Sequence, residues 1–209
     1  MTNKLLTAKE LWAKIGRKPA GQPDAGPRLP PGQRETRDWP VLDLGITPRP
    51  APQDWGLSVS GLVEQPLRWD WDGFHALPRA DMTLDLHCVT GWSRFATRLG
   101  GVAMTTLLDL VKPTVTASHV MLHSYDGYST NLPLSYLCDP DVLLCDQWND
   151  QPLPPEHGGP LRLIVPKLYL WKSAKWLRHI TFMAGDSPGY WEVRGYHMRG
   201  DPWTEERYG

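Results

Sequence analysis

An alternating run at residues 81–88 constrains the fold of this chain more than any other feature. Apolar and polar side chains alternate in the sequence Asp-Met-Thr-Leu-Asp-Leu-His-Cys. A period of two predicts a half-buried β-strand, and Gly91 predicts that a turn follows. The run ends on Cys88, and a thiolate at a strand end serves either as a metal ligand or as a nucleophile. The run alone leaves both roles open.

The fold class follows from how the remaining apolar runs are spaced. Gly and Pro account for 40 of the 209 residues, so turns are frequent, whereas 41% hydrophobic residues and 11 Trp argue for a packed interior. We expect an α+β fold of mixed β-sheets with short helices and long loops. The expected helices cover 70–77, which alternatively forms a turn, and 103–111. The expected strands cover 57–63, 83–88, 119–124, 128–134, 142–147, 161–165 and 177–183.

The N-terminal residues differ from the rest of the chain. Thr7 and Glu10 have the spacing of a capping box, and Gly16 ends the helix predicted at 7–15. Residues 17–37 are rich in Pro, Gly and basic side chains. We therefore divide the chain into an N-terminal helix and arm, 1–37, and a domain with a C-terminal tail, 38–209. The arm acts as a linker or wraps a partner or a cofactor.

Charge and hydropathy exclude several classes of partner. The net charge is -1 and the pI is about 6.6, so nucleic acid is not expected as a partner. No run approaches 18 apolar residues, so no membrane span is expected. The three cysteines do not have zinc-ligand spacing and suit a reducing compartment. Without a recognisable export signal, we expect a cytoplasmic protein.

A second informative segment is basic and covers residues 154–178. Arg162 precedes the apolar run Leu-Ile-Val, so its charge enters the protein interior and requires a carboxylate or a bound anion. Gly158 and Gly159 permit a close approach of the backbone to a ligand. Lys172, Ser173 and Lys175 supply donors for phosphate oxygens. A solvated basic rim with one internal ion pair explains the same residues.

Several motifs in one order resemble the molybdopterin domain of the sulfite oxidase family. They are His-Cys-Val-Thr-Gly-Trp-Ser at 87–93, Asp-Gly-Tyr-Ser-Thr-Asn-Leu-Pro-Leu at 126–134, Glu-His-Gly-Gly-Pro-Leu-Arg-Leu-Ile-Val-Pro at 156–166 and Lys-Ser-Ala-Lys-Trp at 172–176. The resemblance covers residues 38–183. The chain is similar to small single-domain members such as the bacterial methionine sulfoxide reductase molybdoenzyme subunit.

The resemblance implies an oxidoreductase that contains molybdopterin with one molybdenum. It implies that Cys88 supplies the protein sulfur ligand to the metal, since a soft thiolate suits molybdenum already held by dithiolene sulfurs. The metal then cycles between Mo(VI) and Mo(IV) and transfers an oxygen atom to or from a small substrate. Other positions match cofactor-binding residues of the family, namely Leu42, Asp43, Ser124, His157, Arg162, Ser173, Ala174 and Lys175.

The resemblance constrains the identity of the substrate less than that of the cofactor. Sulfite oxidases carry neighbouring arginines after the cysteine, whereas this chain has Ser93 and a single Arg94, so sulfite is not expected. Arg94 is the residue we expect to steer a polar or anionic substrate, with Trp92, Tyr169 and Trp171 as an aromatic wall. The electron-transfer partner is unknown. The alternatives are a metal-free enzyme with Cys88 as nucleophile and a non-catalytic pterin-binding module.

Overall fold

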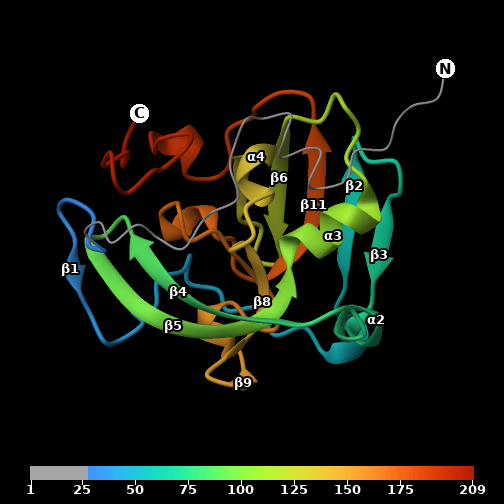
Figure 1. The fold of residues 1–209 in the computed structure, drawn as a ribbon, viewed down its shortest axis with the longest axis horizontal. Coiled ribbons are helices and arrows are strands. Elements are labelled where there is room, and N and C mark those ends of the chain that lie inside the picture. The colour runs from blue at the N-terminus through green and yellow to red at the C-terminus, as the bar shows by residue number, and fades with distance from the viewer. Residues whose placement is uncertain (1–27) are drawn as a thin grey trace.

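A computed structural model describes residues 28–209 of the chain (Figure 1). The helix predicted at 7–15 lies outside the described residues, as does most of the arm. The division of the chain near residue 37 therefore stays a prediction. Arg34 and Glu35 form a short strand, β1, that pairs in parallel with a strand of the main body. The end of the arm thus lies on the domain.

Two mixed β-sheets form the described part of the chain. In the first, the order is β1-β5-β8-β10, with β4 paired to β5 and β9 paired to β8. Its strands are β1 Arg34–Glu35, β4 Ala80–Cys88, β5 Trp92–Ala103, β8 Leu143–Trp148, β9 Gln151–Pro152 and β10 Arg162–Ile164. In the second, the order is β3-β2-β11-β6-β7. Its strands are β2 Leu57–Gly61, β3 Leu67–Trp69, β6 His119–Ser124, β7 Ser129–Pro133 and β11 Leu177–Met183.

The helices are short and lie between strands. They are α2 Trp71–His75, α3 Met104–Val111 and α4 Leu134–Leu137, with 3-10 helices at Pro52–Asp54, Pro155–His157, Leu170–Lys172 and Glu192–Arg194. Asp70 caps α2 by accepting a hydrogen bond from the backbone N–H of Gly73. The predicted strands and both predicted helices are confirmed, and so is the α+β fold class.

The longest strand, β5, was not expected from the sequence. Its alternation is broken by Gly100 and Gly101, where the register against β8 also shifts. A Cβ at Gly101 would overlap the backbone carbonyl of Leu144, so glycine is needed where the strand passes β8 closely. Figure 1 shows β5 as a long, curved strand of the first sheet that runs alongside β4.

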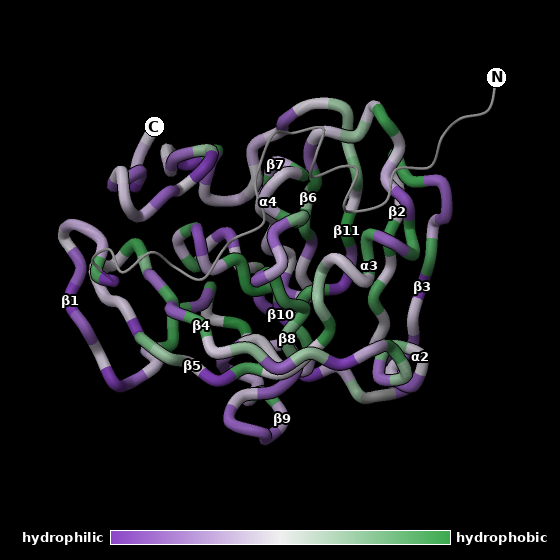
Figure 2. The backbone as a smooth tube through the Cα atoms, viewed as in Figure 1, coloured by the Kyte–Doolittle hydropathy of each residue, from purple (hydrophilic) through white to green (hydrophobic). Residues whose placement is uncertain are grey.

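The main core lies against the second sheet and is continuous with the inner strands of the first. It contains fully buried side chains such as Leu57, Leu122, Leu163 and Ile180. A smaller core, made mostly of residues of the first sheet, includes Cys88, Trp39 and Leu86. Figure 2 shows the hydrophobic residues concentrated along the inner strands, including β6, β8 and β11. The strand that carries Cys88 is therefore anchored in packed structure.

The chain ends in a tail, Gly189–Gly209, that folds back over the first sheet (Figure 1). A bridge between Tyr196 and Tyr208 closes it into a compact loop. None of the helices in residues 28–209 has the length and apolar character needed to cross a bilayer.

Candidate functional site

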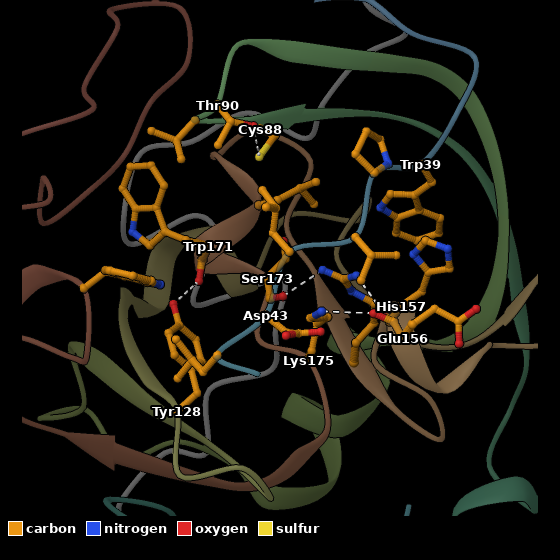
Figure 3. A pocket seen from close by; sticks show the side chains of 18 of the residues that line it. Trp39, Asp43, Cys88, Thr90, Tyr128, Glu156, His157, Trp171, Ser173 and Lys175 are labelled. Atoms are coloured by element: carbon orange, nitrogen blue, oxygen red, sulfur yellow. Dashed lines mark hydrogen bonds between the residues drawn. The ribbon is translucent and has the colours of Figure 1, made fainter. Parts of the chain in front are cut away.

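A cavity of about 360 Å³ brings together segments that are distant in the sequence. It lies between the end of β4, residues 39–44 just after the arm, the segment 156–176 and the C-terminal tail. Figure 3 shows Cys88 and Thr90 at one end, with Lys175, Asp43 and Glu156 at the other. The cavity thus joins a thiol to a basic surface.

Cys88 lies at the end of β4, where a tight turn leads to Trp92 on β5. Gly91 has φ +90, a conformation that glycine adopts without strain, and its N–H donates to the carbonyl of Cys88 at 3.0 Å. The Thr90 hydroxyl donates to the Cys88 sulfur at 3.2 Å. Burial raises the pKa of the Cys88 thiol, against the opposing charges of Arg162 and Arg207. A bound metal would reverse this, because a coordinating thiol is deprotonated.

Both ends of the described chain hold the Cys88 turn. From the arm, Gln33 Nε2 donates to the Cys88 carbonyl at 3.1 Å, and the Arg34 N–H donates to the Gly91 carbonyl at 3.0 Å. From the tail, Arg207 donates to the carbonyl of Val89. These contacts fix the backbone on which the thiol is presented.

Arg162 is the buried cation of the site. It is 3% exposed, and its guanidinium donates to the carbonyls of His157 at 2.7 Å and Ser173 at 2.9 Å. Burial lowers its pKa to about 10. Within the described residues, no carboxylate lies within ion-pair distance of it. Of the two expected partners, a carboxylate or a bound anion, the carboxylate is thus not found among the described residues, and the guanidinium donates to backbone carbonyls.

His157 lies beside Arg162 and stacks on Trp39, with ring centroids 4.4 Å apart. Burial, with a smaller effect from the Arg162 charge, lowers the pKa of His157 to about 4. The imidazole is therefore neutral near pH 7. It can donate one hydrogen bond to a bound ring system and accept another from it.

Lys175 completes the end of the cavity opposite Cys88, which we call the basic end and which also contains His157 and Arg162. Its ammonium donates to the carbonyl of Glu156 at 3.0 Å and lies over the Trp176 ring. Burial, followed by the Arg162 charge, lowers its pKa to about 8. A bound phosphate would oppose that shift by favouring the charged ammonium.

The backbone of this segment also has unused donors. In the described part of the chain, the N–H groups of Ala174 and Lys175 donate no hydrogen bond. Of these two residues Lys175 lines the cavity, and its N–H together with the Arg162 and Lys175 side chains provides the donors that a phosphate requires. The residues present thus fit a phosphorylated cofactor whose other end reaches Cys88.

The glycine pair acts differently from our expectation. Gly158 has φ +105, and a Cβ there would lie 2.9 Å from Lys175 Cβ. A Cβ at Gly159 would overlap the carbonyl of Leu153. The two glycines therefore let protein segments approach each other, and in this way they bring Lys175 against the backbone beside Arg162.

The remaining predicted residues divide into two groups. Leu42, Asp43 and Ser173 line the cavity together with Cys88, His157, Arg162 and Lys175. Ser124 and Ala174 are buried but do not line it. The Ser124 hydroxyl has no hydrogen-bond partner within residues 28–209. Its contact with the cofactor stays a prediction.

Arg94 lies on β5 and does not line the cavity. Its guanidinium donates to the Thr97 hydroxyl at 2.6 Å and to the Arg37 carbonyl, and it lies over the Trp148 ring. These contacts occupy the side chain elsewhere, so the geometry does not support its predicted role in substrate steering.

Aromatic side chains surround the end of the cavity near Cys88. Trp92 and Trp171 line it as expected, whereas Tyr169 stacks behind Trp171 and does not. Further lining residues are Trp39, Thr90, Tyr128, Trp191 and Tyr196. The first three had no site role predicted from the sequence, whereas the C-terminal segment with Trp191 and Tyr196 was expected either to pack as a buried tail or to border the pocket. The aromatic character of Trp39, Tyr128, Trp191 and Tyr196 was the available signal, but it is equally typical of a core.

Comparison with known proteins agrees with this geometry. The family model described as the oxidoreductase molybdopterin binding domain matches residues 44–191. The uncharacterized oxidoreductase YuiH of Bacillus subtilis is 44% identical over 90% of this chain and 95% of its own length. The putative protein-methionine-sulfoxide reductase subunit YedZ1 of Azospira oryzae is 34% identical over 69% of this chain. The match spans 55% of that protein's length.

A solved structure has the same fold. The sulfane dehydrogenase SoxCD from Paracoccus pantotrophus superposes with a TM-score of 0.60 over 66% of this chain and 40% of that chain. The sequence identity is 22%, so the likeness concerns the fold alone.

Proposed function

The chain belongs to the oxidoreductase molybdopterin-binding domain family, which is sulfite oxidase-like, and on this premise we propose that it is a molybdenum enzyme with Cys88 as a metal ligand. It transfers an oxygen atom to or from a small substrate. One observation carries the proposal: the Cys88 thiol and the buried Arg162 cation, which lacks a carboxylate partner in the described residues, line one cavity.

The residues that line the cavity have separate roles in this proposal. Arg162, the Lys175 ammonium and the Lys175 N–H hold the phosphate, and neutral His157 hydrogen-bonds the pterin ring. Cys88 provides a soft ligand for molybdenum. When bound, the cofactor supplies the redox chemistry of oxygen-atom transfer, and the protein orients it and excludes water. The aromatic residues near Cys88 enclose the place where the substrate binds.

The structure favours this role over a metal-free cysteine nucleophile. Such a nucleophile needs an activated thiolate with a neighbouring base. Burial raises the Cys88 pKa, and the adjacent His87 directs Nδ1 to the Ser93 hydroxyl at 2.8 Å. The thiol is therefore not activated by the protein alone. A non-catalytic pterin-binding module would keep the basic end but would not need Cys88.

Metal and pterin analysis tests the proposal. Protein made in a cofactor-competent host should contain about one molybdenum per chain, together with molybdopterin. Cys88→Ser should lose most of the metal, whereas Cys138→Ser, which changes a buried cysteine outside the cavity, should retain it. Wild-type protein that contains neither molybdenum nor pterin would overturn the proposal.

We also propose that the protein is cytoplasmic, since its three free cysteines suit a reducing compartment. Cell fractionation with an antibody against the chain tests the location. Recovery of the protein outside the cytoplasm would contradict it.

A further inference from the structure

The C-terminal tail is built into the wall of the cavity. Trp191 and Tyr196 of the tail line it. The tail joins β7 at Gly189, where a Cβ would lie 2.5 Å from the Ser129 carbonyl, and Tyr190 N–H donates to that carbonyl at 2.8 Å. The tail thus approaches β7 more closely than any residue with a side chain could.

A fully buried ion pair fastens the tail to the cavity wall. Lys172 Nζ lies 2.5 Å from Glu192 Oε1, and both side chains are 0% exposed. Lys172 also donates to Asn131 Oδ1 at 2.8 Å, and the Thr130 hydroxyl donates to Glu192 at 2.9 Å. Burying two charges is costly unless each is well satisfied, so a pair in this place calls for a reason other than stability.

The buried ion pair between Lys172 and Glu192 also contacts Trp171, which lines the cavity. Its indole N–H donates to Glu192 Oε1 at 3.0 Å. The tail also packs on the ring, because Tyr196 meets it edge-on at 5.2 Å and a Cβ at Gly200 would lie 2.6 Å from it. Figure 3 shows Trp171 on the side of the cavity near Thr90 and Cys88.

We propose that Glu192 is a positioning residue for the substrate: its buried carboxylate fixes the Trp171 ring and so sets the size of the space beside Cys88. This inference rests on the proposed function, since it takes that space as the place where the substrate binds. The side chains that enclose this end are aromatic and uncharged (Trp92, Trp171, Trp191 and Tyr196). Glu192 therefore selects substrates by the fit of an apolar group against Trp171.

A single substitution of Glu192 is a poor test, because it leaves the Lys172 charge buried and unpaired and so endangers the fold. We therefore compare two variants that both carry Lys172→Met. In the amide variant, Lys172→Met/Glu192→Gln, the amide oxygen still accepts from Trp171. In the apolar variant, Lys172→Met/Glu192→Leu, that acceptor is gone. Trp171→Phe removes the same hydrogen bond from the other partner and leaves the ion pair in place.

The readout is the shape of the space beside Cys88, measured on the cofactor-free full chain. Cys88 is alkylated with small iodoacetamide or bulky N-phenylmaleimide, and modification of its peptide is followed by mass spectrometry. The ratio of the two rates cancels any change in the reactivity of the thiol. We expect the amide variant to keep the preference for the small reagent. The preference should fall about fivefold to tenfold in the apolar variant and in Trp171→Phe, the loss that one hydrogen bond supports.

Two outcomes would overturn the inference. One is an unchanged ratio in the apolar variant while its fold is intact by circular dichroism. The other is an equal loss in the amide and apolar variants, which would indicate a general structural effect. Because the measurement needs no molybdenum, its failure is distinct from failure of the proposed function, which metal analysis decides.

Discussion

The imidazole of His157 stacks on the indole of Trp39, with an angle of 24° between the ring planes. The two residues come from segments more than a hundred positions apart, and Trp39 belongs to the segment that follows the arm. This stack holds His157 beside Arg162 and buries both. The residues before the matched family domain therefore help to build the basic end of the cavity.

Acidification should destabilise the fold through His157. Its folded pKa of about 4 lies below the ordinary value of about 6.5, so the unfolded chain binds more protons between these values. The free energy of unfolding should therefore fall as the pH is lowered from about 6.5 to 4. Urea denaturation of the wild type and of His157→Gln across that range measures the effect. An equal pH dependence in the two proteins would contradict it.

Gly158→Ala should weaken both the fold and cofactor retention. The substitution places a Cβ 2.9 Å from Lys175 in a backbone conformation that disfavours alanine. Gly127→Ala is the matched control, since its φ is +86 but nothing lies within 4 Å of the new Cβ. Both carry a backbone cost of about 1 kcal/mol, so denaturation should show a larger loss only at Gly158. Similar losses would mean that the contact with Lys175 is unimportant.

Lys175→Met should reduce cofactor retention more than it changes the fold. The ammonium contacts one carbonyl and one ring in the described residues, so little structure depends on it. Purified Lys175→Met should contain less pterin than the wild type, while its denaturation midpoint changes slightly. Lys167→Met serves as the control, because Lys167 pairs with Asp139 away from the cavity. Full pterin content in Lys175→Met would exclude a phosphate at this end.

Arg207→Met should loosen the Cys88 turn. Arg207 donates to the Val89 carbonyl, and its charge acts on the Cys88 thiol. We expect less molybdenum per chain and an altered electron paramagnetic resonance signal of the remaining metal. Arg199→Met removes another arginine of the tail, one paired with Glu206, and should leave the signal unchanged. The same signal in all three proteins would remove Arg207 from the site.

Much of this fold was predictable because its strands have a period of two. The alternation before Cys88 predicted β4, and an apolar run predicted β10. A charge at the edge of that buried run correctly indicated that Arg162 enters the interior. The local sequence was sufficient to predict a feature wherever the pattern that determines it lies within one strand.

The remaining features depend on contacts between distant segments. β5 escaped prediction because the close passage of Gly101 against Leu144 interrupts its pattern. Nothing near Trp39 indicates that it will stack on His157, and nothing near Glu192 indicates a partner at Lys172. Arg94 was expected to steer the substrate, but its guanidinium donates to the hydroxyl of Thr97 on the same strand, β5.

The central claim is that Cys88 binds molybdenum through sulfur. X-ray absorption at the molybdenum edge counts the sulfur atoms around the metal. The account predicts one more sulfur per molybdenum in the wild type than in the fraction of Cys88→Ser that retains metal. An equal number of sulfur ligands in the two proteins would contradict it.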